Sequence, residues 1–96
     1  MREQDFEEYL RSDESIISKK KAVVSRISKA RLIERVLGVD LDEVVSDDDV
    51  MYDTLIRVKL ETKDQNGNNS NALRKYYEFF NGNKFPTLAE YERKEA

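Results

Sequence analysis

Residues 17–38 read ISKKKAVVSRISKARLIERVLG, and this stretch decides the fold. Apolar side chains recur in it every three or four residues, which is the spacing of one face of an α-helix. The stripe consists of Val23, Ile27, Ala30 and Leu37, with Ile33 beside it. Gly38 follows and favours the left-handed conformation that ends a helix. The pattern predicts one long amphipathic helix over about residues 17–37.

The same stretch carries most of the local positive charge. Residues 16–35 contain seven of the seventeen Lys and Arg residues and one acid, a local charge of +6 in a chain of net charge −3. That acid, Glu34, lies close to the apolar stripe and needs a donor such as Arg31 or Arg57 if it is buried. Residues 36–62 contain eight acids against two bases, a local charge of −6. Because a surface of one sign attracts the opposite sign, the basic half predicts a phosphate-bearing partner.

The composition excludes several classes of protein. The chain has 96 residues, enough for one small domain, and contains neither cysteine nor histidine. Disulfides, thiolate metal sites, the usual general base and the commonest metal ligand are therefore missing. No apolar run reaches the roughly 18 residues that span a bilayer, and the acidic start is no signal peptide, so we expect a cytoplasmic protein without a membrane partner. Because no catalytic or metal motif is present, we expect neither catalysis nor a cofactor.

Two shorter helices are predicted on either side of the long one. The first covers about residues 4–11, with its apolar face formed by Phe6, Tyr9 and Leu10. After Gly38, Asp40 is followed three residues later by Glu43, which is the pattern of a capping box. We therefore expect a short helix over about residues 41–45.

Another helix is predicted to start near Ser46. The serine hydroxyl can cap free amides, and the three aspartates after it favour the positive end of the helix dipole. The expected inner face consists of Val50, Met51, Thr54, Leu55 and Val58. Tyr52 and Ile56 point elsewhere and are expected to meet a second neighbour.

The last clear helix is predicted over about residues 71–80, after a loop at residues 63–70 that is rich in turn-forming side chains. Its inner face consists of Ala72, Leu73, Tyr76 and Phe80. Arg74, Lys75 and Tyr77 are placed towards its outer side, with a core position equally open for Tyr77. Residues 83–96 form a tail with a possible short helix after Pro86. The prediction is an all-α domain of four main helices and one short one.

The basic face of the long helix is the first candidate for a binding site. Lys21, Ser25 and Lys29 fall opposite the apolar stripe, at about 100° per residue. Lysines neutralise phosphates, and serine hydroxyls add hydrogen bonds to them. The alternative is a solvated face balanced by the acidic segment. The pair of Arg74 and Lys75 beside an exposed tyrosine is the second candidate, because it can touch a backbone while the ring stacks on a base.

The acids between residues 40 and 49 are a weaker candidate for a cation site. They lack the glycine and the terminal glutamate of a calcium-binding loop. Helix capping explains them without a ligand. We therefore predict no metal site.

Three segments in order carry a family resemblance. They are FEEYL at residues 6–10, the serine-started basic helix, and ALRKYYEFF at residues 72–80. In this order the chain resembles the N-terminal SAM-like, or core-binding, domain of phage integrases and tyrosine recombinases. The resemblance covers residues 6 to about 80, and its motifs are mainly apolar spacing and a few basic positions.

This resemblance implies a four- to five-helix SAM-like orthogonal bundle over residues 1–82, with residues 83–96 as a tail or linker. In the family, this domain arches over one face of duplex DNA, and a separate domain carries the catalytic residues. The implied function is a DNA-binding module that clamps the duplex backbone. The side chains implied at the DNA are Lys19, Lys20, Lys21, Ser25 and Lys29 on the basic helix, and Arg74 and Lys75 on the last helix.

A rival prediction comes from a different functional class. In it, the chain is a protein-interaction domain without DNA binding, and the acidic segment faces a protein partner or a second copy. The exposed side chains of that surface would be Tyr52, Ile56 and Tyr77.

Overall fold

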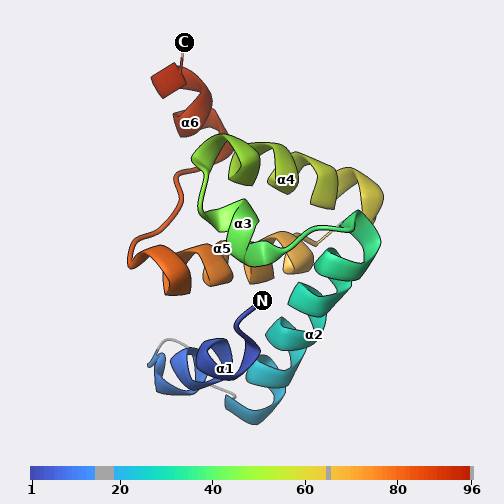
Figure 1. The fold of residues 1–96 in the computed structure, drawn as a ribbon, viewed down its shortest axis with the longest axis vertical. Helices are drawn as coiled ribbons and strands as arrows, with labels where there is room; N and C mark the ends of the chain where they lie inside the picture. The colour runs from blue at the N-terminus through green and yellow to red at the C-terminus, as the bar shows by residue number, and fades with distance from the viewer. Residues whose placement is uncertain (15–18, 65, 96) are drawn as a thin grey trace.

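The computed structural model describes residues 1–14, 19–64 and 66–95, apart from the side chains of Lys19 and Glu95. Within these ranges it contains six α-helices and no β-strand (Figure 1). They are α1 (Glu3–Ser12), α2 (Lys19–Leu37), α3 (Leu41–Val45), α4 (Asp48–Glu61), α5 (Asn68–Asn81) and α6 (Leu88–Glu95). The predicted all-α class is confirmed, whereas the SAM-like arrangement stays a prediction.

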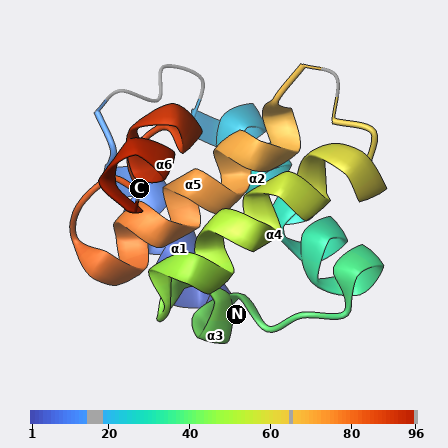
Figure 2. The same ribbon diagram turned by 90° about the horizontal axis from the view of Figure 1, so that it is seen from above.

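Helix α5 lies in the middle of the bundle. It contacts α1, α2, α3 and α4. Figures 1 and 2 show α4 and α5 side by side, with α2 crossing them and α6 at the far end from α1. The predicted apolar stripe of α2 is buried, from Val23 at one end to Leu37 at the other. This burial holds α2 against the rest of the bundle and leaves its basic face outward.

An aromatic cluster joins α1 to α5. The ring of Phe6 packs edge-on against Tyr76, with 5.0 Å between ring centroids, and Phe79 lies 5.6 Å from Phe6. Phe6 and Tyr76 are both fully buried. Aromatic pairs in this geometry stabilise beyond the area that they bury. The two apolar faces predicted for the first and last helices therefore meet each other.

The start of α4 differs from the prediction. Asp47, not Ser46, caps the helix, and its carboxylate accepts a hydrogen bond of 2.9 Å from the amide of Asp49. The hydroxyl of Ser46 instead donates to the backbone oxygen of Asp42. Val50, expected on the inner face, is 42% exposed. Val50 lies in the first turn of α4, at the edge of the buried face that Met51, Thr54, Leu55 and Val58 form.

The start of α5 differs from the prediction as well: this helix begins earlier than expected, at Asn68. The cause is Asp64, whose buried carboxylate accepts hydrogen bonds from the amides of Asn69 (3.0 Å) and Ser70 (2.9 Å) and from the Ser70 hydroxyl (2.7 Å). Amides of a first helical turn have no partner within the helix, so this carboxylate extends α5 into the predicted loop.

Residues after Gly82 turn back onto the bundle, although we expected a tail or linker there. Phe85 and Tyr91 are buried, and the ring of Phe85 packs edge-on against Tyr77, 5.1 Å away. Tyr91 stacks on Tyr52 of α4, which is the second neighbour predicted for that side chain. The same packing buries Tyr77, which is 5% exposed, so of the two positions left open for this side chain the core position is the one that it occupies.

Raising the pH above about 10 is expected to destabilise this fold. Burial, and then the hydrogen bond to Asp48, raise the pKa of Tyr77 from 10.0 to about 12, and burial also raises the pKa of Tyr76. A raised pKa in the folded state means that stability is fully present below pH 10 and is lost as the pH rises towards 12. Circular dichroism and tyrosinate absorbance, followed together, should show these two tyrosines ionising only as helix is lost. Full ionisation with intact helices would contradict the prediction.

Candidate functional site

A groove follows the seam between α2 and α5, made of three adjoining hollows. Their volumes are about 250, 220 and 270 Å³. The middle hollow shares Arg26 and Asn71 with the first, and Lys29 and Asn68 with the third. We call these three hollows the α2–α5 groove. Its basic side chains are Arg26, Lys29, Lys63, Arg74, Lys75 and Lys84.

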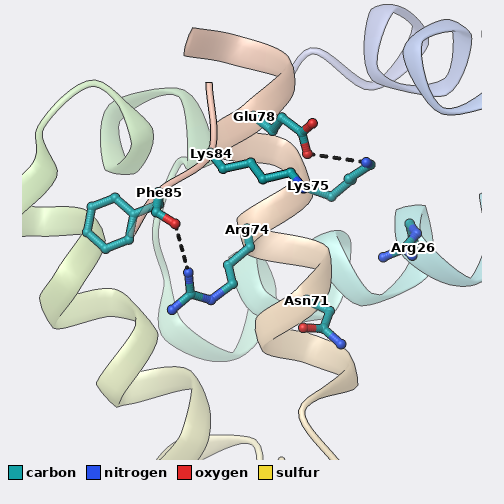
Figure 3. Close-up of a pocket in the computed structure, with 7 residues that line it drawn as sticks. All are labelled: Arg26, Asn71, Arg74, Lys75, Glu78, Lys84 and Phe85. Carbon is teal, nitrogen blue, oxygen red and sulfur yellow. Dashed lines mark hydrogen bonds and ion pairs between the residues drawn. The ribbon is translucent and has the colours of Figure 1, made fainter. Parts of the chain in front are cut away.

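Helical spacing brings these side chains to one seam. On α2, Ser25, Arg26 and Lys29 lie within one turn, beside the buried stripe. On α5, Asn68 and Asn71 follow each other at the same spacing. Since α2 and α5 pack against each other along their buried faces, the polar edges of both helices line the groove. Figure 3 shows Arg26 reaching the first hollow from α2, opposite the α5 side chains.

The two acids that line the groove in the described ranges already have hydrogen-bond or ion-pair partners within the protein. Asp64 in the third hollow caps α5, as described above. Glu78 in the first hollow accepts from Lys75 at 3.2 Å, and Lys75 also pairs with Asp13. Burial would lower the pKa of Lys75, but the hydrogen bonds from its ammonium to these two acids outweigh burial and raise it. The charge of Lys75 is therefore held, and it is compensated within the protein.

The five other cations of the groove have no such compensation. Within residues 1–14, 19–64 and 66–95, no carboxylate forms an ion pair with Arg26, Lys29, Lys63, Arg74 or Lys84. Arg74 donates instead to the backbone oxygen of Phe85 at 3.2 Å (Figure 3). It also donates to the backbone oxygen of Pro86 at 3.0 Å. Burial lowers the pKa of its guanidinium, which is ordinarily far above neutral pH. The groove is thus positively charged and suits an anion.

The structure brings together four of the predicted site residues. Ser25, Lys29, Arg74 and Lys75 all line the groove, and the ammonium of Lys29 donates to the Ser25 hydroxyl at 2.6 Å. Lys20 and Lys21 are exposed near the start of α2 and line none of the three hollows. The side chain of Lys19 lies outside the described part of the chain.

Sequence reasoning missed several lining residues. Arg26 is three residues before Lys29, so helical spacing could have placed it beside that lysine. Lys84 reaches the groove only because the chain turns back after Gly82, and no local pattern indicates this. Asn68 was predicted in the loop and Asn71 at the start of the last predicted helix. The sequence therefore showed no sign that both lie on the same face of one helix.

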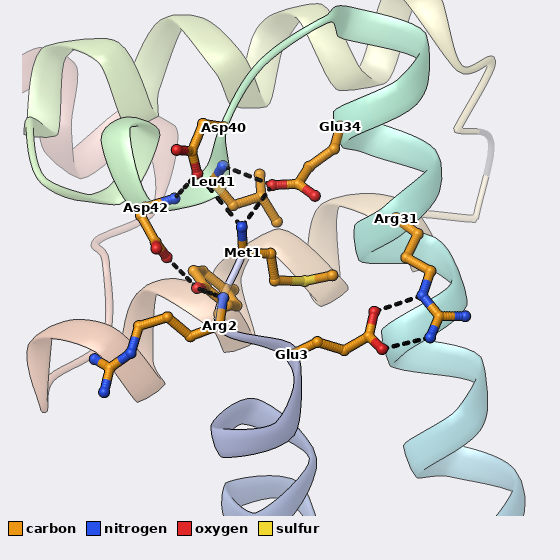
Figure 4. A network of polar contacts seen from close by, with 9 residues as sticks. Met1, Arg2, Glu3, Arg31, Glu34, Asp40, Leu41 and Asp42 are labelled. Carbon is orange, nitrogen blue, oxygen red and sulfur yellow. Dashed lines mark hydrogen bonds and ion pairs between the residues drawn. The ribbon is translucent and has the colours of Figure 1, made fainter.

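A second polar cluster joins α1, α2 and α3 and has a structural role (Figure 4). Glu34 accepts from the Met1 ammonium at 3.1 Å and from the amide of Leu41 at 3.0 Å. Arg31 and Arg57, suggested as its donors, pair with Glu3 and Glu61 instead. Every acid of this cluster therefore has a partner inside the protein, and the cluster offers no vacant site.

Much of the surface predicted for a protein partner packs within the protein instead. Tyr77 is buried and donates to Asp48 at 2.7 Å, while Tyr52 is covered by Tyr91 and donates to Glu92. In the described ranges, no three acids come together as a metal site, and no helix has the length and apolar character needed to cross a bilayer. Exposed large apolar side chains remain at separate places, such as Leu60, which is 74% exposed.

Comparisons with family models, with curated proteins and with solved structures gave no match to this chain. The resemblance to the recombinase core-binding domain therefore stays a prediction from the sequence.

Proposed function

We propose that this chain binds the phosphate backbone of duplex DNA through the α2–α5 groove. The observation that carries the proposal is the set of groove cations that have no carboxylate partner in the described part of the chain, whose net charge as a whole is −3. A phosphate backbone supplies the missing negative charge at regular spacing. Lys20 and Lys21, exposed on the same helix, extend the basic surface beyond the groove.

The uncharged side chains of the groove support a phosphate partner. Ser25, Asn68 and Asn71 place hydroxyl and amide donors among the cations. Such donors commonly contact phosphate oxygens and set the orientation of a protein on the duplex without reading its sequence. The role that this suggests is a binding module of the recombinase core-binding type, acting by backbone contacts and not by catalysis.

Salt dependence of binding to a labelled random duplex is the direct test. Anisotropy measured at about 50 and about 200 mM salt is expected to show weakening by about tenfold or more, since several counterions are released. Absence of duplex binding at the lower salt concentration would contradict the proposal.

Lys29→Gln is expected to weaken duplex binding by a similar factor for every sequence. It should also reduce the slope of log affinity against log salt by about 1, because one phosphate contact is lost. Lys29 makes no ion pair in the described part of the chain, so the fold should tolerate the change. Lys59→Gln is the matched control, because Lys59 is exposed on α4 and lines none of the three hollows. Equal losses in both variants would mean that binding does not use the groove.

A further inference from the structure

The middle hollow of the groove differs from the other two in its chemistry. It is lined by Ala22, Ser25, Arg26, Lys29, Asn68 and Asn71. This lining contains two cations, one hydroxyl and two amides, and it contains no acid. The first hollow contains Glu78, and the third contains Asp64. The middle hollow is therefore the part of the groove where an anion meets only cations and polar groups.

The size of the middle hollow limits what it can hold. Its volume is about 220 Å³. This is room for about seven waters at about 30 Å³ each, and it is below the range of about 300 to 1,000 Å³ for drug-sized ligands. A tetrahedral oxyanion with part of its hydration shell fits this volume.

Arg26 contributes an observation of its own. Its Nε is buried and has no hydrogen-bond partner in the part of the chain that the structure describes. A buried donor without an acceptor is energetically unfavourable. No neighbouring side chain in the described residues accepts a hydrogen bond from this Nε–H group. The hydroxyl of the adjacent Ser25 accepts from Lys29 instead. Arg26 also lines the middle hollow, so an anion there would meet its positive charge.

From these observations we infer that the middle hollow is a seat for a single phosphate group, held by Arg26 and Lys29 from α2 and by Asn68 and Asn71 from α5. The inference deepens the proposed function and rests on it only for the source of the phosphate. A charged guanidinium forms short, strong hydrogen bonds to phosphate oxygens, and Lys29 adds a second positive charge. The source is a phosphodiester of the backbone or a terminal phosphomonoester, which share this chemistry.

The test is a titration of the whole chain with inorganic phosphate, followed by the NMR signals of the arginine Nε–H groups. The Arg26 signal should shift and saturate, while that of Arg35, exposed on the same helix and outside the groove, should not. Arg26→Gln should weaken phosphate binding by about tenfold or more, because a charged hydrogen bond is lost. Arg35→Gln should leave binding unchanged. Equal, unsaturated shifts of both arginines would overturn the inference.

A second arm separates this inference from the proposed function and identifies the source. The same duplex is titrated with and without a 5′-phosphate. A loss of affinity in Arg26→Gln for both duplexes assigns a backbone phosphodiester to the seat, and a loss only for the phosphorylated duplex assigns a terminal phosphate. If phosphate saturates the Arg26 signal but neither duplex binds, the seat stands and the proposed function fails. If both duplexes bind and Arg26→Gln changes neither affinity, the seat is wrong and the proposed function stands.

Discussion

Tyr76→Ala is expected to lower the free energy of unfolding by about 3 to 5 kcal/mol, which is the usual cost of truncating a buried aromatic ring. Tyr76 is the largest fully buried side chain, and its ring contacts Phe6 on α1 and Phe79 on its own helix. Alanine would leave a cavity between α1 and α5. Domains of this size have about 5 to 15 kcal/mol of stability, so the loss is a large fraction of the total. Urea unfolding followed by circular dichroism measures it.

Tyr76→Phe separates the hydroxyl from the ring. The hydroxyl oxygen accepts from the amide of Arg2 at 2.8 Å, and the hydroxyl donates to Asp42. Phenylalanine removes both bonds and leaves partly buried groups without partners, which should cost about 1 to 3 kcal/mol. Tyr52→Phe is the matched control, because its hydroxyl donates to Glu92 at an exposed position and should cost less than about 0.5 kcal/mol. Equal costs would show that the buried hydroxyl has no special role.

Asp64→Ala is expected to cost about 2 kcal/mol, at the upper end for removal of a helix cap. Three donors of the first turn of α5 lose their acceptor at once, and the side chain that is removed is buried. The first turn should fray, which amide hydrogen exchange at Asn69 and Ser70 would detect. Asp53→Ala, at an exposed position on α4, is the control and should change stability by less than about 0.5 kcal/mol.

The contribution of Asp64 should also depend on pH. Burial would raise the pKa of its carboxyl, but the hydrogen bonds from Asn69 and Ser70 outweigh burial and hold the pKa below the ordinary 3.8. A lowered pKa in the folded state means that the stabilisation is present above pH 3.8 and is lost as the pH falls through the folded value. The difference in unfolding free energy between the wild type and Asp64→Asn should therefore shrink below about pH 4. A difference independent of pH would contradict this assignment.

The local sequence pattern was sufficient to predict most of the helices. The stripe from Val23 to Leu37 predicted α2, and the capping box at Asp40 predicted α3. Both signals act within a few residues, so they can be recognised without knowing the fold. The start of α5 was missed because Asp64 reads as part of a turn-rich loop until its carboxylate is seen against the helix amides.

The candidate site was only partly predictable. Lys29 and Arg74 were chosen as outward basic side chains, and both line the groove. Their relation to each other depends on how α2 packs on α5, which helical periodicity does not specify. The position of Tyr77 stayed open between core and outer side because its partner, Phe85, comes from a segment that carries no strong pattern.

The all-α class, the apolar face of α2 and the concentration of positive charge on that helix could all be predicted from the amino-acid pattern. These properties follow from side-chain spacing and from short-range capping, which act along the chain. The tertiary structure alone decided which cations share a groove and which are compensated by acids. It paired Lys75 with Asp13 and Glu78, and among the residues that the structure describes it left Arg26 and Lys29 without a carboxylate. The physical reason is that charge compensation depends on distances in space, and residues far apart in the chain meet only once the core has packed.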